Sequence, residues 1–506
     1  MSRPPFTIGI AFAAAAVLAG RAGATNYLVA GGTDDFTTNG GCSLREALAA
    51  ATTNAPRDAC AAGAADVADV IQLTSGIYSW NLGHFVMNGG GPLTVRGPAS
   101  ASPTAILDLG DHSRFVYAIG AALTLEKLVV RDGNAFADTV DPLGGVVRAF
   151  ESSLTLRSSN FVSNRANGGG VAAFQSGQSS AAPLLVERCL FIGNTAESGG
   201  GFTLPKGGAL FVQLEGAATA RIVDSRLSGN RAQSTVAGDQ ATGGGFYATA
   251  YGEGDLELLR AEVADNVATP GAGSFSSGAG GTILSGEASR VAVTDTTWTG
   301  SDLQGTGLNG SALSLLASGT STVRIERARF TGNDVGQPVW QLGLDATGEA
   351  EVTLADGLVA DGSNGGVRAR AAETSTVRMG HVTFTGCGTG TTLETTGAGV
   401  IRIENALFWN NGEDVADTVP SAVDPSTLRG VDPLFVNPGA GDYHLGAGSP
   451  AVDFGNRTLP SVGPYDLDHA LRVIGAQTDA GAFERGGLFA DSFESGDRGD
   501  WAGAVP

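Results

Sequence analysis

A short strand-and-turn unit recurs along most of the 506-residue chain, and each copy ends in Asn or another turn-compatible residue. In the copy TVRIERARFTGN at 322–333, apolar Val323 and Ile325 alternate with charged side chains, which indicates a strand with one buried face. Gly332 and Asn333 then provide turn chemistry, because both residue types tolerate a left-handed backbone. The turn positions are Asn164, Asn194, Asn230, Asn266, Ser301, Asn333, Asp361, Cys387 and Asn411.

The spacing of these turns predicts a solenoid. The interval is 36 residues between Asn194 and Asn230 and shortens to 24 between Cys387 and Asn411. Repeats of this length build architectures in which each unit stacks on the next. Gly pairs followed by short apolar runs, such as Gly207-Gly208 before ALFV, divide each unit into two or three short strands. Such strands must pair with the neighbouring unit, so we expect parallel sheets that rise by about 4.8 Å per coil.

The N-terminus has the features of a secretory signal peptide. Arg3 gives a weak positive region, residues 6–18 are apolar, and Ala22-Gly23-Ala24 matches a small-residue cleavage site. The apolar stretch is shorter than the ~20 residues that a membrane-spanning helix needs. We therefore predict export to the extracellular space or cell surface, with no transmembrane helix after removal of the signal.

The composition is acidic. The formal net charge is −21, and Lys occurs only at positions 127 and 206. Such a surface disfavours nucleic acid and anionic membranes as partners. It fits a soluble exported protein, and it could also attract divalent cations.

Two of the four cysteines precede the repeats. Cys42 and Cys60 enclose a short loop, and in an exported protein a disulfide between them is the natural interpretation. Ser43 and Glu46 are spaced as a capping box, which predicts a short helix in this segment. A solenoid exposes the edges of its first strands, so a capping element is physically required there.

The segment GGCSLREALAAA at 40–51 resembles the CSLREA domain, an N-terminal part of exported bacterial proteins with right-handed parallel β-helices. The Phe-x-x-Asn and Gly-Gly-Ala elements are similar to polymorphic outer membrane protein repeats. DPLFVNPGAGDYHLGAGSPAVDFG at 432–455 is similar to the closing coil of such proteins, and LFADSFESGDRGDW at 488–501 to a C-terminal tail of exported Gram-negative proteins. The resemblance implies an all-β, right-handed parallel β-helix of about ten or more coils with a small N-terminal helical cap, from a Gram-negative bacterium.

These observations divide the chain into five parts. They are a signal peptide at 1–24, an N-terminal cap at 25–65, the β-helix at 66–455, a C-terminal cap segment at 456–487, and the tail motif at 488–506.

No catalytic residue is predicted. Motifs that are typical of polygalacturonase-like glycosidases and pectate lyases are missing from the sequence. A lyase also needs a strong base near neutral pH, and Lys is almost absent. Asp466, Asp468 and Asp479 are weak candidates for calcium, because paired carboxylates on a loop supply oxygen ligands. The alternative for these three is a polar network that closes the end of the solenoid, and no other cofactor is expected.

The repeated asparagines are interpreted as scaffold. Stacked Asn side chains at equivalent turns can form a hydrogen-bonded ladder that satisfies buried amides. We predict this ladder for Asn164, Asn194, Asn230, Asn266, Asn333 and Asn411.

The predicted function is that of a non-enzymatic, exported or cell-surface protein for display, adhesion, or glycan or protein binding. The alternative is a polysaccharide lyase or glycosidase with an unrecognised active site. Three long units leave extra residues outside the coils, and loops on a rigid scaffold often bind ligands. These loops are 195–206, 232–242 and 267–279, with Phe202 and Phe275 as candidate stacking residues. The ligand and the oligomeric state stay open.

Overall fold

The computed structural model describes residues 24–486 except 66, 139, 199–203, 306–309, 334–338 and 418–421. Residues 1–23 of the predicted signal peptide and the whole tail motif at 488–506 lie outside the described residues, as does Phe202.

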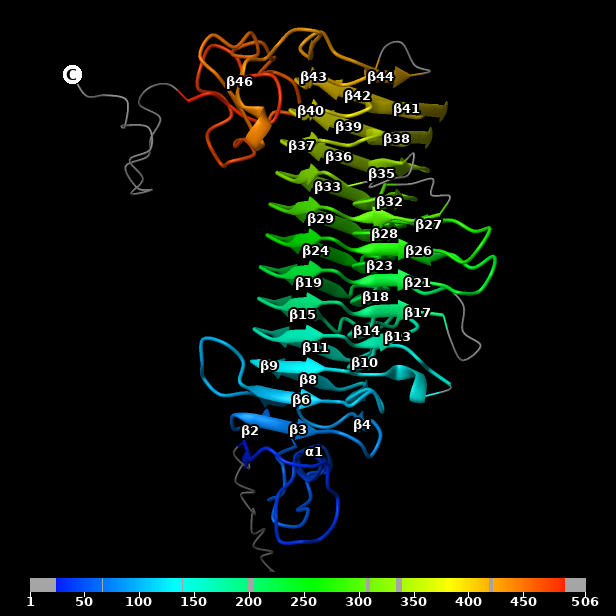
Figure 1. The fold of residues 1–506 in the computed structure, drawn as a ribbon, viewed down its shortest axis with the longest axis vertical. Coiled ribbons are helices and arrows are strands. Elements are labelled where there is room, and N and C mark those ends of the chain that lie inside the picture. Colours follow the sequence, from blue (N-terminus) through cyan, green and yellow to red (C-terminus); the bar gives the residue numbers. More distant parts are fainter. Residues whose placement is uncertain are drawn as a thin grey trace, which may run out of the picture.

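The chain winds into a right-handed parallel β-helix, which confirms the predicted fold class. A typical coil contributes one strand to each of three long parallel sheets, so the neighbours in a sheet come from successive coils. Figure 1 shows the coils stacked along the long axis, with the N-terminal part at the lower end.

The first sheet has 13 strands. They are β1 Asn26–Val29, β2 Asp69–Leu73, β5 Leu93–Arg96, β8 Ala122–Glu126, β11 Ser153–Arg157, β15 Leu184–Glu187, β19 Thr219–Val223, β24 Asp255–Leu259, β29 Arg290–Thr294, β33 Thr322–Glu326, β36 Glu351–Ala355, β39 Thr376–Gly380 and β42 Val400–Glu404.

The second sheet also has 13 strands. They are β3 Gly76–Ser79, β6 Ala105–Asp108, β9 Leu128–Arg131, β12 Asn160–Val162, β16 Leu190–Ile192, β20 Arg226–Ser228, β25 Glu262–Ala264, β30 Thr297–Thr299, β34 Arg329–Thr331, β37 Leu358–Ala360, β40 Thr383–Thr385, β43 Leu407–Trp409 and β45 Leu428–Arg429.

The third sheet has 12 strands. They are β4 Phe85–Asn88, β7 Val116–Ile119, β10 Val147–Phe150, β14 Ala172–Gln175, β18 Leu210–Leu214, β23 Phe246–Ala250, β28 Gly281–Ser285, β32 Leu313–Ala317, β35 Trp340–Ala346, β38 Gly365–Glu373, β41 Thr389–Gly397 and β44 Glu413–Asp417.

A shorter fourth sheet joins the long units. It comprises β13 Arg165–Ala166, β17 Thr195–Glu197, β21 Arg231–Gln233, β26 Val267–Thr269 and β31 Asp302–Leu303. β22 Ala241–Thr242 pairs with β27 Ser276–Ser277, and a 3-10 turn, η1, spans Ala135–Ala137. The three predicted loops therefore begin as ordered strands, and the second and third also contain the paired strands β22 and β27 near their ends.

The interior follows the period-2 pattern of the sequence. Val323 and Ile325 of β33 are fully buried, and their charged neighbours face outward. Aromatic rings stack from coil to coil inside the second sheet, as Phe161 does on Phe191 with ring centroids 5.2 Å apart. Burial of these side chains stabilises the fold by about 25 cal/mol per Å² of apolar surface removed from water.

The Gly pairs form the turns that lead into the third sheet. Gly207 has a φ of 68°, and a Cβ added to it would lie 2.0 Å from the carbonyl oxygen of Leu210. A side chain at this position would collide with the backbone, so the turn requires glycine.

The N-terminal segment closes the lower end of the solenoid. Helix α1, Leu44–Thr53, has the predicted capping box, since Ser43 Oγ accepts from Glu46 N and Glu46 Oε2 accepts from Ser43 N. A disulfide joins Cys42 to Cys60. β1 pairs with β2, so the segment at 25–65 also supplies a strand of the first coil.

The stacked strands end at β45, earlier than the predicted boundary at 455. The following chain forms the 3-10 turn η2, Pro438–Ala440, and the antiparallel pair β46, Phe435–Asn437, and β47, Asp442–Leu445. This C-terminal segment lies beside the last coils (Figure 1), where Tyr443, Leu467 and Phe483 pack against Leu358 and Ala360 of β37. Its apolar side chains are covered by the outside of the second sheet, which no local sequence pattern could predict.

Candidate active site

The ladder asparagines line one inner corner of the coils. Asn194 Oδ1 accepts from Asn164 N and Nδ2, both at 3.0 Å, and Asn230 and Asn266 repeat this pattern in the next coils. Farther along, Asn333 Oδ1 accepts from Ser301 N, and Asn411 Oδ1 accepts from Cys387 N. The side chains of Asn164, Asn194, Asn230, Asn266 and Asn333 are fully buried and that of Asn411 is partly buried, so they hold the scaffold together.

Gln341 takes part in the ladder as well. Its Oε1 accepts from Asn333 N at 3.2 Å. In the earlier coils, the side-chain oxygen of the next ladder Asn accepts this backbone hydrogen bond. The sequence analysis missed Gln341 because it lies outside the strand-and-turn repeat, only 8 residues after Asn333.

The three candidate metal ligands are held apart by separate bonds. Asp466 accepts from the backbone N of Asp468, Ala470 and Glu484, and Asp479 accepts from the backbone N of Asp453 and Arg485. Asp468 forms ion pairs with Arg329 and His444. Over the described residues, no cluster of three or more His, Cys, Asp or Glu side chains could hold a metal ion. Each of the three carboxylates instead fastens the C-terminal segment.

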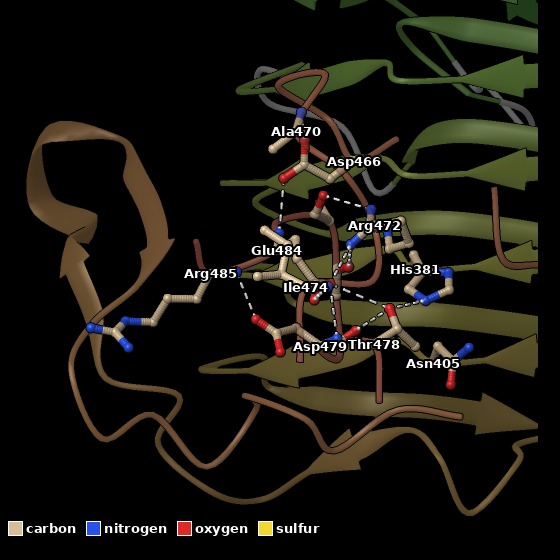
Figure 2. Close-up of polar contacts among 12 residues, drawn as sticks. His381, Asn405, Asp466, Ala470, Arg472, Ile474, Thr478, Asp479, Glu484 and Arg485 are labelled. Atoms are coloured by element: carbon tan, nitrogen blue, oxygen red, sulfur yellow. Dashed lines mark hydrogen bonds and ion pairs between the residues drawn. The ribbon is translucent and has the colours of Figure 1, made fainter. Parts of the chain in front are cut away.

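A buried polar network surrounds Arg472 (Figure 2). Arg472 Nη2 donates to Asp356 Oδ1 at 2.5 Å, and Arg472 Nη1 lies 3.9 Å from Glu484 Oε2. His381 Nε2 lies 2.9 Å from Thr478 Oγ1. Burial raises the pKa of Asp356 to about 6 and that of Glu484 to about 7, and it lowers the pKa of His381 well below its ordinary value.

This network is closed to solvent, because Arg472, His381 and Thr478 are fully buried. Perturbed pKa values are a feature of active sites, but they also arise in structural ion-pair networks. With no access for a substrate, the network serves to fix the C-terminal segment to the coils.

An open site lies on the outer face of the third sheet. The turn that precedes each of its strands is aligned from coil to coil by bridges between Leu143 and Gly168, Gly168 and Lys206, and Lys206 and Thr242. Beside this turn, outward side chains of neighbouring strands stand next to each other, because β14 pairs with β18 and β18 with β23 in register.

A cavity of about 210 Å³ opens at this position. Its lining residues are Leu143, Asn167, Gly168, Leu204, Lys206 and Phe211. Phe211 stacks on Tyr247 of the next strand, with ring centroids 5.7 Å apart and an interplanar angle of 9°. Apolar walls combined with a few polar groups are typical of ligand pockets.

Lys206 is the one titratable side chain that lines this cavity. Its Nζ lies 4.8 Å from the centroid of the Tyr247 ring, and among the described residues it forms no ion pair with a carboxylate. Partial burial lowers the pKa of Lys206 below its ordinary value of 10.5. Desolvation favours the neutral amine, which is the form that can accept a proton.

Cationic and aromatic side chains continue along the same face. Arg148 of β10 donates to Asp141 Oδ2 at 2.9 Å and to Gln175 Oε1 at 2.7 Å. Arg114 lies over the ring of Tyr117, 5.5 Å from its centroid. Both guanidinium groups are buried, at 1% exposure for Arg114 and 4% for Arg148, and each is paired with a carboxylate, that of Asp138 and that of Asp141.

The projecting loops border this face. Leu204 and Lys206 end the first predicted loop, 195–206, and line the cavity. Phe275 of the third loop is 41% exposed and lies outside the cavity. The sequence analysis expected ligand contacts on the loops themselves, whereas the cavity forms where a loop rejoins the sheet.

No protein-family model and no curated protein sequence matches the chain, so its place among CSLREA-domain proteins stays a prediction. Solved structures match the fold. The pectate lyase Pel9A is 12% identical, with a TM-score of 0.33, over 92% of this chain and 98% of that chain. A mannuronic acid-specific family 6 polysaccharide lyase from human gut microbiota is 13% identical, with a TM-score of 0.37, over 80% and 84%.

The A-module of the mannuronan C-5 epimerase AlgE6 of Azotobacter vinelandii is 12% identical, with a TM-score of 0.35, over 71% of this chain and 90% of that chain. The names of these proteins are those of lyases and an epimerase, which contradicts the predicted non-enzymatic display or adhesion role and agrees better with its alternative, a polysaccharide lyase or glycosidase with an unrecognised active site. At such low identity the likeness shows the fold alone, and any activity must be argued from the cavity.

No helix among the described residues has the length and apolar character that a membrane crossing requires.

Proposed function

We propose that this protein is an exported enzyme that acts on an acidic polysaccharide, with Lys206 as the general base. The observation that carries the proposal is the position of Lys206, a lysine with a lowered pKa and no carboxylate partner among the described residues, in an open cavity beside stacked aromatic rings.

The cavity suits one sugar unit of a chain. Phe211 forms an apolar wall of the cavity, which suits the C–H face of a pyranose, while Tyr247, stacked on it, is only 6% exposed and does not line the cavity. Successive strands of the third sheet are about 4.8 Å apart, so a polysaccharide laid along the sheet would meet equivalent positions on successive coils. The face is therefore able to bind a linear chain at several points.

Lys206 favours an acidic sugar, because it is the one charged side chain that lines the cavity and it forms no ion pair with a carboxylate of the described residues. Arg148 is 4% exposed and is paired with Asp141, so it contributes no free charge to the cavity. The net charge of −21 opposes a polyanion at long range. Salt screens that repulsion beyond about 8 Å at physiological ionic strength, so local contacts decide binding.

The chemistry is proton abstraction next to a carboxylate. Neutral Lys206 takes the proton from C5 of a uronate, which leaves the electron pair on C5. If the bond from C4 to the glycosidic oxygen then breaks, a C4–C5 double bond forms and the leaving oxygen takes a proton. If a proton returns to the opposite face of C5, the product is the epimer. Both outcomes begin with the same step at Lys206.

The experiment is an assay of the purified protein on polygalacturonate, alginate and a neutral glucan. Elimination is followed by the ultraviolet absorbance of the unsaturated product, and epimerisation by deuterium incorporation at C5 in heavy water. We expect turnover of an acidic polymer and none of the neutral one.

Lys206→Met retains the apolar stem but removes the amine, so it should abolish turnover while the protein stays folded. Lys127→Met, at the other lysine, is the matched control and should leave activity unchanged. Phe211→Ala should raise KM more than it lowers kcat. Full activity of Lys206→Met, or no reaction with any acidic polymer, would contradict the proposal.

A further inference from the structure

Asp69 is a buried carboxylate at the start of β2. The residue is 2% exposed, and its Oδ2 accepts from Ala64 N at 2.9 Å. Its Oδ1 accepts from Thr25 N at 2.8 Å. The surrounding chain is tightly packed, since a Cβ on Gly63 would lie 2.4 Å from Asp69 Oδ2.

The charge of Asp69 has no basic side chain opposite it. Among the described residues, the ion pairs of Arg, Lys and His do not include Asp69, so only neutral donors satisfy its oxygens. A buried carboxylate is costly unless a positive charge compensates it. The nitrogen of Thr25, 2.8 Å from Asp69 Oδ1, would carry a positive charge if the chain began at Thr25.

Among the described residues, Thr25 is the first whose hydrogen bonds to the N-terminal cap are seen. Its Oγ1 donates to Ala62 O at 2.9 Å, and its carbonyl oxygen accepts from Val70 N at 2.9 Å. Ala24, directly before it, is exposed. Ala24 is also the last residue of the small-residue motif Ala22-Gly23-Ala24.

The predicted removal of residues 1–24 would leave Thr25 as the first residue, and we propose that its new α-ammonium then forms an ion pair with the buried carboxylate of Asp69. A processing peptidase delivers water to the peptide bond. The bond breaks, Ala24 keeps the carboxylate, and Thr25 gains the ammonium. This inference rests on the proposed export and is independent of the chemistry at Lys206.

Processing therefore strengthens the contact that is already present. An amide N–H gives one neutral hydrogen bond to Asp69, whereas an ammonium gives a charge-assisted bond at the same place. The pair lies where β1 joins the first sheet, so the processed chain should hold its N-terminal cap more firmly than the unprocessed chain.

The first test identifies the N-terminus. The protein is expressed with its own leader in a Gram-negative host, recovered from outside the cytoplasm, and sequenced from its N-terminal end. Thr25 as first residue supports the proposal. Any other first residue, or an intact leader on exported protein, overturns it, and neither result bears on the activity assay.

The second test measures the ion pair. Protein that begins at Thr25 is compared with protein that retains Gly23-Ala24, each with and without Asp69→Asn. We expect Asp69→Asn to lower the midpoint of thermal unfolding much more in the shorter protein than in the extended one. Asp255→Asn, at the exposed first residue of β24 in the same sheet, is the matched control and should have equal, small effects in both.

Equal losses from Asp69→Asn in the two proteins would overturn the ion pair.

A pH series of the two proteins with intact Asp69 avoids any folding defect of the variant. An α-amino group has an ordinary pKa of about 7.7–8.0, and an ion pair raises it in the folded state. The advantage of the shorter protein should thus be complete below about pH 7.7 and be lost as the pH rises through the raised value. A pH-independent difference would contradict the proposal.

Discussion

Arg472 and Asp356 form a buried ion pair across 116 residues of sequence, with Arg472 Nη2 2.5 Å from Asp356 Oδ1. Arg472 also donates to the carbonyl oxygens of Gly481 and Ala482, at 3.1 and 2.9 Å. The pair joins the turn after β36 to the C-terminal segment, so one side chain links the coils to the chain that packs beside them.

Removal of Arg472 should strongly destabilise the protein. Arg472→Met leaves the Asp356 carboxylate buried without its partner, which typically costs about 3–5 kcal/mol. Guanidinium denaturation monitored by circular dichroism measures the loss. The double variant Arg472→Met/Asp356→Asn should lose less than Arg472→Met alone, because the uncompensated charge is gone. The account would be contradicted if the double variant lost more unfolding free energy than the two single variants lose together.

The stability should also depend on the protonation of Glu484. Burial raises its pKa from 4.5 to about 7, so the folded protein holds this proton more tightly than the unfolded chain. The contribution to stability is then complete below about pH 4.5 and declines as the pH rises through about 7. The size is roughly 2–4 kcal/mol, from 1.36 kcal/mol per pKa unit.

Denaturant titrations from pH 4 to 8 on the parent and on Glu484→Gln measure this contribution. The difference in unfolding free energy between the two proteins should change across that range, because Gln cannot titrate. A difference that stays constant with pH would show that Glu484 has an ordinary pKa in the folded protein.

The fold could be predicted because its signals are local. Each coil repeats its own alternation and its own turn, and Val323 and Ile325 show their buried face within five residues of sequence. The position of the C-terminal segment has no such signal. Leu467 and Phe483 meet Leu358 only after the chain turns back, so the sequence indicated a polar end network but not the sheet that it covers.

The ladder prediction can be tested at its centre. Asn230→Ala removes the acceptor of Asn194 N and the donor to Phe191 O, which lie 3.0 and 3.1 Å away. Buried groups without partners cost about 1–3 kcal/mol, and we expect a loss of that size in unfolding free energy. Asn437→Ala is the matched control, because Asn437 is exposed and its side chain makes no cap hydrogen bond. Equal effects at the two positions would argue against the ladder.

The cap disulfide is expected to contribute as well. Cys42 and Cys60 are 18 residues apart, and closing a loop of this size stabilises by about 3 kcal/mol on the chain-entropy model. Cys42→Ser/Cys60→Ser should lose that amount in denaturant unfolding, and mass mapping of non-reduced peptides should find the two residues joined. Alkylation of both thiols without prior reduction would exclude the bond.

The candidate active site was harder to predict than the scaffold. Lys206 meets Phe211 and Tyr247 only because the bridges Gly168–Lys206 and Lys206–Thr242 align three successive coils. The scarcity of lysine was taken as evidence against a lyase. The position of Lys206 was more informative about the site, since this residue directly precedes the Gly207-Gly208 turn into the third sheet.

Lys206 should titrate at a lower pH than an ordinary lysine. Desolvation lowers its pKa from 10.5, so its amine becomes neutral and nucleophilic at a pH where a solvated amine is still protonated. Competitive labelling with trace acetic anhydride from pH 6 to 11, read by peptide mass spectrometry, gives the titration midpoint of each lysine. Labelling of Lys127 serves as the internal reference for the reagent, because these are the only two lysines in the sequence.

Tyr247→Ala opens the site to water and should move the Lys206 midpoint upward, whereas Tyr251→Ala, at a more exposed tyrosine, should not. A midpoint for Lys206 at or above 10.5 in the parent protein would remove the chemical basis for its role as a base.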